Sequence, residues 1–428
     1  MLPPPRPSGG TERLSIRARA LTFRAPAPAP RSAMPPPRGS RGGGREDGER
    51  QGTDRHAALD ALRGVAVILA MVDHVKVQFV PEVRVLVPLT RLSTPAFVIP
   101  FGAMLELPYL TAVRRGRPGG IAAGRMASRA WACALLSCAL LAAAALGGHL
   151  EPRGAAAAAV GLDWGRFDEI LLIYAMLFAL VLALWRPVLR HGAPLILGLA
   201  AAGWAARAAL GPVLDDPGYG ASFLLGVGTG YGPALLPGLT FLGAGMACRE
   251  VLTGLRGPAL PLAILVAAGA VAMWGLGDGP VEAARRFLAH RWTNHPGYYA
   301  AGLLSTAGIA AALAAGLRRT RTARAVRWLA TIGTQALFVY GAGNMALNLL
   351  PAPDLPAAAG IAVAAAFLAA LIGLALLGPG GRDRLALGLS GRWARLHVAT
   401  QDTALAAARG ALGALRRGPA GSPRAPAG

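Results

Sequence analysis

The chain has 428 residues, of which 54% are hydrophobic and only 15% are charged, whereas about a quarter of the residues in a soluble globular domain are charged. Its formal net charge is +22, from 43 Lys and Arg against 21 Asp and Glu. Such an excess would suggest nucleic acid in a soluble protein, but here the basic residues stand mostly in the tails and in alternate loops, where membrane topology accounts for them. The composition therefore argues against a soluble or nucleic-acid-binding protein and favours a polytopic membrane protein.

Apolar runs recur along the chain, and they reach or approach the roughly 20 residues that span a bilayer. They are rich in Ala, Leu and Val without the alternation of barrel strands, so they predict an all-α bundle of about ten transmembrane helices. The predicted spans are roughly 57–80, 86–110, 127–147, 167–185, 193–210, 222–248, 259–276, 297–317, 328–350 and 356–377. Gly and Pro interrupt the run 222–248, which predicts an irregular or re-entrant piece there.

The two ends of the chain differ from the apolar middle. Residues 1–55 are rich in Pro, Gly and Arg, a composition that predicts a disordered N-terminal tail. Residues 56–378 form the predicted membrane domain. Residues 379–428 form a basic cytoplasmic tail, for which an amphipathic helix on the inner membrane surface and a disordered segment both stay open.

Arginines alternate between the loops once the N-terminus is placed in the cytoplasm. The first inner loop and the start of the next helix contain Arg114, Arg115, Arg117, Arg125 and Arg129, and later inner loops carry more. Outer loops and helix ends hold acidic residues such as Asp163 and Glu169, although the outer loop 277–296 is basic. This alternation predicts a plasma-membrane protein with both termini in the cytoplasm.

Ionisable residues gather on one face of the first predicted span. Eleven helical steps bring His74 back to within roughly 20° of Arg63, about 16 Å further along the axis, and Asp60 falls within roughly 40° of His74. Asp73 and Lys76 flank the histidine. Charged groups at membrane depth usually face a polar cavity or a partner, so this face is the strongest candidate site in the chain.

Each of these residue types has a chemical use and a structural alternative. The imidazole of His74 can act as a general base near neutral pH, and Arg63 can hold a phosphate or carboxylate while Asp60 orients it. Alternatively, Asp60 and Arg63 form an interfacial ion pair and His74 an interhelical hydrogen bond. Asn344 and Asn348, four residues apart on one predicted helix, are expected to make hydrogen bonds between helices. No Cys or His spacing indicates a metal site.

The segment 55–74 resembles the first helix of the acyltransferase-3 superfamily of membrane acyltransferases. Both have a basic residue, then Leu-Asp-x-Leu-Arg-Gly-hydrophobic-Ala, and a His about three turns after the Arg. The segment 90–102 is similar to that family's Arg-x-x-x-Pro-x-Phe helix. Segments 168–174 and 333–340 resemble the OpgC-type glucan succinyltransferase branch, and the heparan-glucosaminide N-acetyltransferase-like branch shares much of the pattern.

The resemblance implies acyl transfer from cytoplasmic acyl-CoA, as a co-substrate and not a bound cofactor, to a hydroxyl or amine of a carbohydrate-type acceptor on the far side. It implies that His74 is the general base or the acyl carrier, with Arg63 and Asp60 beside it. Four basic residues could attract the phosphates of CoA, although positive-inside anchoring explains them equally well: Arg114, Arg115, Arg125 and Arg129.

Two other functions stay open. In a multi-pass transporter or flippase, Asp60, Arg63 and His74 would relay protons or bind substrate. Two broken helices in matching halves would favour transport, but only 222–248 is clearly broken. The third alternative is a catalytically inactive relative that serves as an assembly partner.

Overall fold

The computed structural model divides the chain into two compact units, residues 1–48 and 49–428, and all helices beyond the first turns of α1 belong to the second unit. The described residues are 43–83, 86–214, 218–228, 232–252, 257–274, 291, 293–351, 353 and 355–377. Most of the predicted N-terminal tail, most of the outer loop 277–296 and the C-terminal tail 379–428 lie outside them. The predictions for those segments therefore stay predictions, although α1 begins at Gly43, inside the predicted tail.

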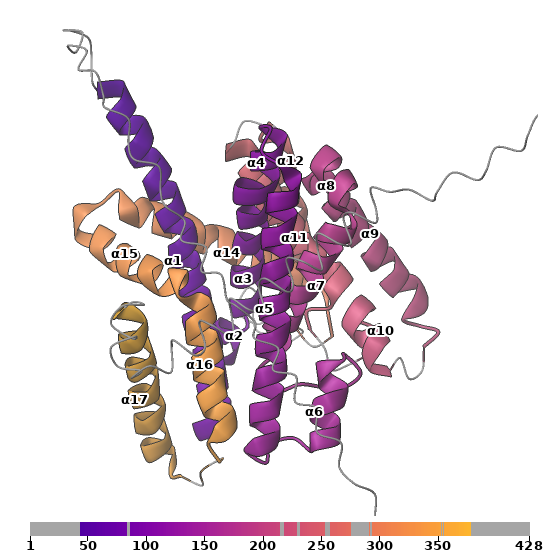
Figure 1. The fold of residues 1–428 in the computed structure, drawn as a ribbon, viewed down its shortest axis with the longest axis vertical. Helices are drawn as coiled ribbons and strands as arrows, with labels where there is room; N and C mark the ends of the chain where they lie inside the picture. Colours follow the sequence, from indigo (N-terminus) through magenta and orange to yellow (C-terminus); the bar gives the residue numbers. More distant parts are fainter. Residues whose placement is uncertain are drawn as a thin grey trace, which may run out of the picture. The chain divides into compact units, whose positions relative to one another are not determined.

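Every regular element of the described residues is helical, which confirms the predicted all-α class (Figure 1). The elements are α1 (Gly43–Phe79), α2 (Val87–Thr90), α3 (Ser93–Leu105), the π-helical turn η1 (Glu106–Thr111), α4 (Ala112–Arg114), α5 (Gly119–Leu146), α6 (Pro152–Ala159), α7 (Glu169–Ala183), α8 (Trp185–His191), α9 (Ala193–Leu210), α10 (Gly218–Leu225), α11 (Leu235–Leu252), α12 (Ala259–Trp274), α14 (Pro296–Leu317), α15 (Thr320–Thr334), α16 (Ala336–Leu349) and α17 (Ala357–Leu376).

Five segments of the described chain are long and apolar enough to cross a membrane: Val87–Arg114, α5, α9, α14 and α17. A sixth is added if α7 and α8, which meet at a bend of 82°, count as one span. The predicted count of about ten is not confirmed. The predicted run 222–248 is divided into α10 and α11, and the predicted run 328–350 is divided at Gln335 into α15 and α16.

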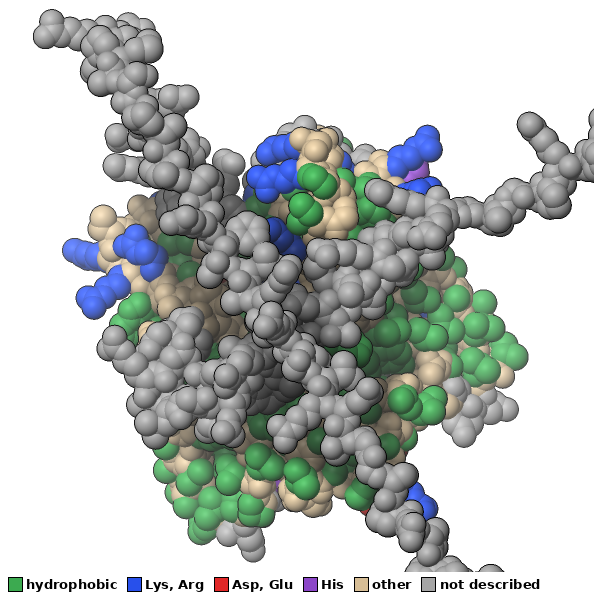
Figure 2. Space-filling model, viewed as in Figure 1, with side chains coloured by type: hydrophobic (Ala, Val, Ile, Leu, Met, Phe, Trp, Pro, Cys, Tyr) green, Lys and Arg blue, Asp and Glu red, His purple; other side chains and the backbone are tan. Residues whose placement is uncertain are grey.

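Large apolar side chains on several helices face outward. On α12, Val266 is 63% exposed and Met273 is 66% exposed, and on α17 Ile361 is 52% exposed. In Figure 2, hydrophobic side chains cover much of the visible surface, and Lys and Arg gather over the positions of α4, α8 and α15. Exposed apolar surface of this extent is what a lipid environment would cover.

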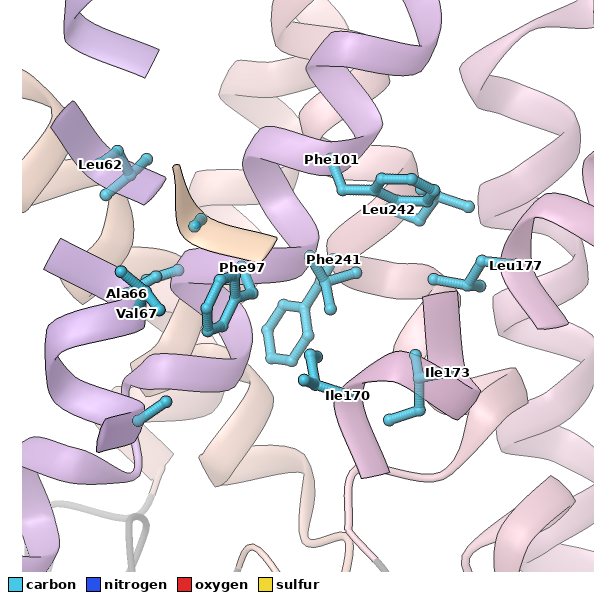
Figure 3. Packing of buried hydrophobic residues seen from close by; sticks show 14 of the residues in the cluster. Leu62, Ala66, Val67, Phe97, Phe101, Ile170, Ile173, Leu177, Phe241 and Leu242 are labelled. Carbon is cyan, nitrogen blue, oxygen red and sulfur yellow. The ribbon is translucent and has the colours of Figure 1, made fainter. Parts of the chain in front are cut away.

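The core of the second unit is built by helices that approach closely at small residues. A Cβ on Gly102 of α3 would lie 2.2 Å from the carbonyl oxygen of Leu242 on α11, and one on Gly245 of α11 would lie 2.0 Å from that of Ile99 on α3. Glycine at both positions lets the two backbones touch, as in helix pairs within membranes. Figure 3 shows the buried hydrophobic cluster that fills the space between α1, α3, α7 and α11.

Candidate functional site

A polar cavity of about 230 Å³ lies next to the C-terminal half of α1. Its walls come from α1, from α3 and the residues before it, from the segment before α7, and from α16. The ionisable side chains in the lining are Asp73, His74, Arg91, Arg166, Glu169 and Arg291. The cavity thus combines an imidazole, two carboxylates and three guanidinium groups.

His74 is held in this cavity by α16. Its Nδ1 lies 2.7 Å from Oδ1 of Asn344. The imidazole stacks on the ring of Phe167 with the ring centres 4.3 Å apart, and Tyr340 meets it edge-on at 5.7 Å. When Asn344 Oδ1 accepts a hydrogen bond from Nδ1–H, the lone pair stands on Nε2, which is the arrangement of a general base.

Both carboxylates of the lining are paired with cations. Asp73 lies 3.2 Å from Nζ of Lys76 and 3.8 Å from Arg91, and it accepts a hydrogen bond of 2.9 Å from the hydroxyl of Thr90. Glu169 lies 2.8 Å from Arg291. The two carboxylates of this region are therefore compensated by cations, as charges away from water must be.

The segment before α7 forms one wall of the cavity and is fixed from α16. Phe167 has a positive φ of 60°, a conformation that costs energy for a bulky residue and persists only where the surroundings impose it. The hydroxyl of Tyr340 donates to the carbonyl of Phe167 at 2.8 Å, and the amide of Asn348 donates to that of Arg166 at 3.4 Å. Tyr340, Asn344 and Asn348 follow one another at four-residue steps, so a single face of α16 positions both the histidine and this wall.

Arg166 is the wall's charged residue. Its guanidinium donates to the side-chain oxygen of Gln78 and lies over the ring of Phe167, 4.8 Å from the ring centre. Partial burial lowers the pKa of Arg166 below its ordinary value, but an arginine still keeps its charge at neutral pH.

The structure separates the three residues that the sequence predicts on one catalytic face. Asp60 and Arg63 form an ion pair of 3.2 Å with both side chains partly exposed, and neither residue lines the cavity. Figure 3 shows Ala66 and Val67 of α1 beside Phe97 of α3, within the buried cluster. His74, in contrast, lines the cavity, about 16 Å along α1 from Arg63. The catalytic roles of Asp60, Arg63 and His74 stay predictions.

The predicted phosphate-binding arginines also lie away from the cavity. Arg114 pairs with the fully buried Glu106 and donates to the carbonyl of Leu189 on α8 at 3.0 Å. Arg115, Arg125 and Arg129 are exposed. The segment that forms the cavity wall precedes α7, and α8 follows α7. About 22 Å of helix therefore separates the cavity wall from α8, which Arg114 contacts.

Sequence reasoning did not select several residues that line the cavity. Arg91, Glu169 and Tyr340 lie in the segments that resemble the acyltransferase-3 pattern, but they were not recognised as site residues. Arg291 lies in the segment 277–296, which the sequence predicts to be an outer loop and which breaks the charge alternation. Its position as an exception to the positive-inside pattern was the one signal that could have identified it.

Comparison with family models, with curated proteins and with solved structures gave no match to this chain. What the structure defines is a class: a helical chain with several helices of membrane-spanning length and a polar cavity around a histidine. The cavity takes His74, Arg91, Glu169 and Tyr340 from four segments far apart in the sequence. Those are the four segments that carry the resemblance described above.

Proposed function

We propose that this chain is an integral membrane acyltransferase that moves an acyl group from cytoplasmic acyl-CoA to a hydroxyl or amine of a carbohydrate-type acceptor. The observation that carries the proposal is His74 in a polar cavity with its Nδ1 bound by Asn344 at 2.7 Å. A histidine held in this way has one nitrogen fixed and the other available for chemistry. The convergence of the four resembling segments on the same cavity adds independent support.

The chemistry assigned to His74 follows from that geometry. Nε2 takes the proton of the attacking hydroxyl or amine while the acceptor oxygen or nitrogen forms a bond to the thioester carbon. The carbon–sulfur bond then breaks, and the proton passes from Nε2 to the departing thiolate. In the alternative sequence, Nε2 attacks the thioester carbon and the carbon–sulfur bond breaks, so CoA leaves as its thiolate. The acceptor then attacks the acyl group, the bond to Nε2 breaks, and the acceptor's proton passes to the thiolate.

Positive charge around the histidine suits this reaction. The guanidinium groups of Arg91 and Arg291 line the same cavity as His74. Attack on a thioester places negative charge on the carbonyl oxygen, and fixed positive groups in a partly desolvated site stabilise that charge. Asp73 and Glu169 hold the two arginines in place through their ion pairs.

We further propose about ten spans, a plasma-membrane location and cytoplasmic termini. In this topology α1, the α7–α8 pair, α11, α12 and α16 add to the five segments already counted. The basic residues of α4, α8 and α15 then face the cytoplasm. The phosphates of CoA would stay near Arg63, Arg114, Arg115, Arg125 and Arg129, because burying phosphate costs more than burying the apolar arm that carries the thioester.

The decisive experiment uses purified protein in sealed vesicles of known orientation, with labelled acyl-CoA supplied on one side and oligosaccharide acceptors on the other. Mass spectrometry of the acceptor detects the added acyl group. We expect transfer only when acyl-CoA is on the side of the α4 and α8 arginines, and loss of transfer in His74→Ala but not in His149→Ala, a partly exposed histidine outside the cavity. Movement of an unmodified acceptor across the vesicle without acyl-CoA would favour the transporter instead.

A further inference from the structure

Positive charge exceeds negative charge around the His74 cavity. The lining has three arginines, Arg91, Arg166 and Arg291, against the two carboxylates of Asp73 and Glu169. Lys76 adds a further cation to Asp73 at 3.2 Å. A cavity with this balance raises the local concentration of anions and disfavours cations.

The ion pairs in the cavity distinguish Arg166 from the other two arginines of the lining. Asp73 faces Lys76 and Arg91, and Glu169 faces Arg291, so both carboxylates are engaged with other cations. The hydrogen-bond acceptor of Arg166 is the neutral amide oxygen of Gln78. Its Nε is buried and makes no hydrogen bond within the part of the chain that the structure describes.

Within the described residues, the two acids of its own segment make hydrogen bonds to groups other than Arg166. Asp163 and Asp168 belong to the same segment, but neither lines the cavity. Oδ1 of Asp163 accepts from the backbone N–H of Trp164 at 2.7 Å, and Asp168 accepts from the hydroxyl of Ser137 on α5 at 2.8 Å. The guanidinium of Arg166 thus carries a positive charge and has an Nε–H donor that makes no hydrogen bond to the described residues.

The position of this guanidinium relative to the histidine is fixed by one ring. Phe167 lies 4.3 Å from the centre of the His74 imidazole and 4.8 Å from the guanidinium carbon of Arg166. Hydrogen bonds from Tyr340 and Asn348 hold the backbone of Phe167 and Arg166. His74 and Arg166 therefore line the same cavity and both contact the ring of Phe167, so one ligand in the cavity can contact both.

We propose that the acceptor carries an anionic group, a carboxylate or a phosphate, and that Arg166 binds this group while His74 acts on a nearby hydroxyl or amine. The inference rests on the proposed acyltransferase function and names its substrate class. A planar guanidinium matches both kinds of oxyanion through parallel hydrogen bonds. The phosphates of the donor are assigned elsewhere, because Arg114, one of the predicted phosphate-binding arginines, contacts α8, and about 22 Å of helix α7 separates α8 from this wall of the cavity.

Matched acceptor pairs test the proposal. One pair is an oligosaccharide containing glucuronate and its carboxyl-reduced form, and the other is a sugar phosphate and its dephosphorylated form. Wild-type protein should prefer the charged member of at least one pair. Arg166→Gln should raise KM for that member about tenfold or more with a small change in kcat, since it removes binding and not chemistry. Arg166→Lys keeps the positive charge, so KM for the charged acceptor should rise less. Arg153→Gln, at an exposed position of α6, is the control.

Calorimetric binding of the same acceptors without acyl-CoA separates this proposal from the proposed function. Binding of the charged acceptor that depends on Arg166, without any acyl transfer, would remove the acyltransferase function but leave the anion site. Equal use of charged and neutral acceptors by wild-type protein would overturn the anion site. So would an unchanged Arg166→Gln variant, or one that loses affinity for acyl-CoA alone.

Discussion

The two halves of α1 differ in how their charged side chains are paired and how deeply they are buried. In the first half, Asp60 and Arg63 form an isolated pair whose side chains are 24% and 29% exposed. In the second half, Asp73 is buried and contacts Lys76, Arg91 and Thr90, and His74 beside it is bound to α16. A pair open to its surroundings contributes little to stability, whereas a buried charge network is costly to break. The same helix thus offers one replaceable ion pair and one cluster on which the site depends.

Among replacements in the two halves of α1, that of His74 should have the largest effect on acyl transfer. His74→Ala removes the proposed general base, so we expect acyl transfer to fall by about 10²–10⁴-fold, with folding and membrane insertion kept. Turnover in detergent or vesicles, alongside the elution profile of the variant, measures both. A folded variant that keeps more than about a tenth of the wild-type rate would remove His74 from the mechanism.

Asp73→Asn should cause the largest loss of stability. The variant keeps the shape and one acceptor for Thr90, but it removes the buried carboxylate that both Lys76 and Arg91 contact. Removing one partner of such a network costs about 3–5 kcal/mol. Thermal unfolding of the purified protein should show the loss. Equal unfolding temperatures for Asp73→Asn and Asp60→Asn would mean that the two halves of α1 do not differ.

Asn344→Ala should give an intermediate effect. Without the amide oxygen at 2.7 Å, Nδ1 of His74 loses the acceptor that selects its tautomer and orientation. We expect the rate of acyl transfer to fall about 10–100-fold, by analogy with residues that orient metal-binding histidines through the second ring nitrogen, with little change in KM. Met345→Ala shortens a partly buried side chain of the same helix outside the cavity lining and is the matched control for packing. Equal rates in these two variants would argue against an orienting role for Asn344.

Asp60→Asn should give the smallest change. A partly exposed pair is worth about 0–1 kcal/mol, so the unfolding temperature should scarcely move. If Arg63 contacts the phosphates of acyl-CoA, Arg63→Gln should raise KM for the donor while Asp60→Asn does so only weakly. A strong loss of stability in either variant would show that the pair is part of the buried network after all.

The sequence alone was sufficient to predict an all-helical fold and to select α1 as the helix that carries the candidate site. Long apolar runs are a direct consequence of membrane-spanning helices, and a helical period places Asp60, Arg63 and His74 on one face. It was also sufficient to expect Asn344 and Asn348 to bond between helices, and the structure shows both of them doing so.

Other features depend on tertiary contacts that leave no local pattern. The apolar run 328–350 continues through Gln335, where α15 ends, so nothing in its hydrophobicity marks the break. Arg91, Glu169 and Arg291 reach one cavity from three separate segments. The helical period predicted a shared face for Arg63 and His74 about 16 Å apart along the axis, but not which of the two lines a cavity, because that depends on what packs against each turn of α1.

The crossing of α1 and α15 sets a mechanical limit on the site. A Cβ on Gly64 would lie 2.1 Å from the carbonyl oxygen of Leu329, and a Cβ on Gly333 would lie 1.6 Å from that of Asp60. In Figure 1, α15 runs across α1 near this point. With no side chain between them, the two backbones are in direct contact, and a larger residue at either glycine would force α1 and α15 apart. Because His74 lies on the same helix, such a shift would move the imidazole relative to α16, so two glycines at a crossing about 15 Å away along α1 help to set the geometry of the cavity.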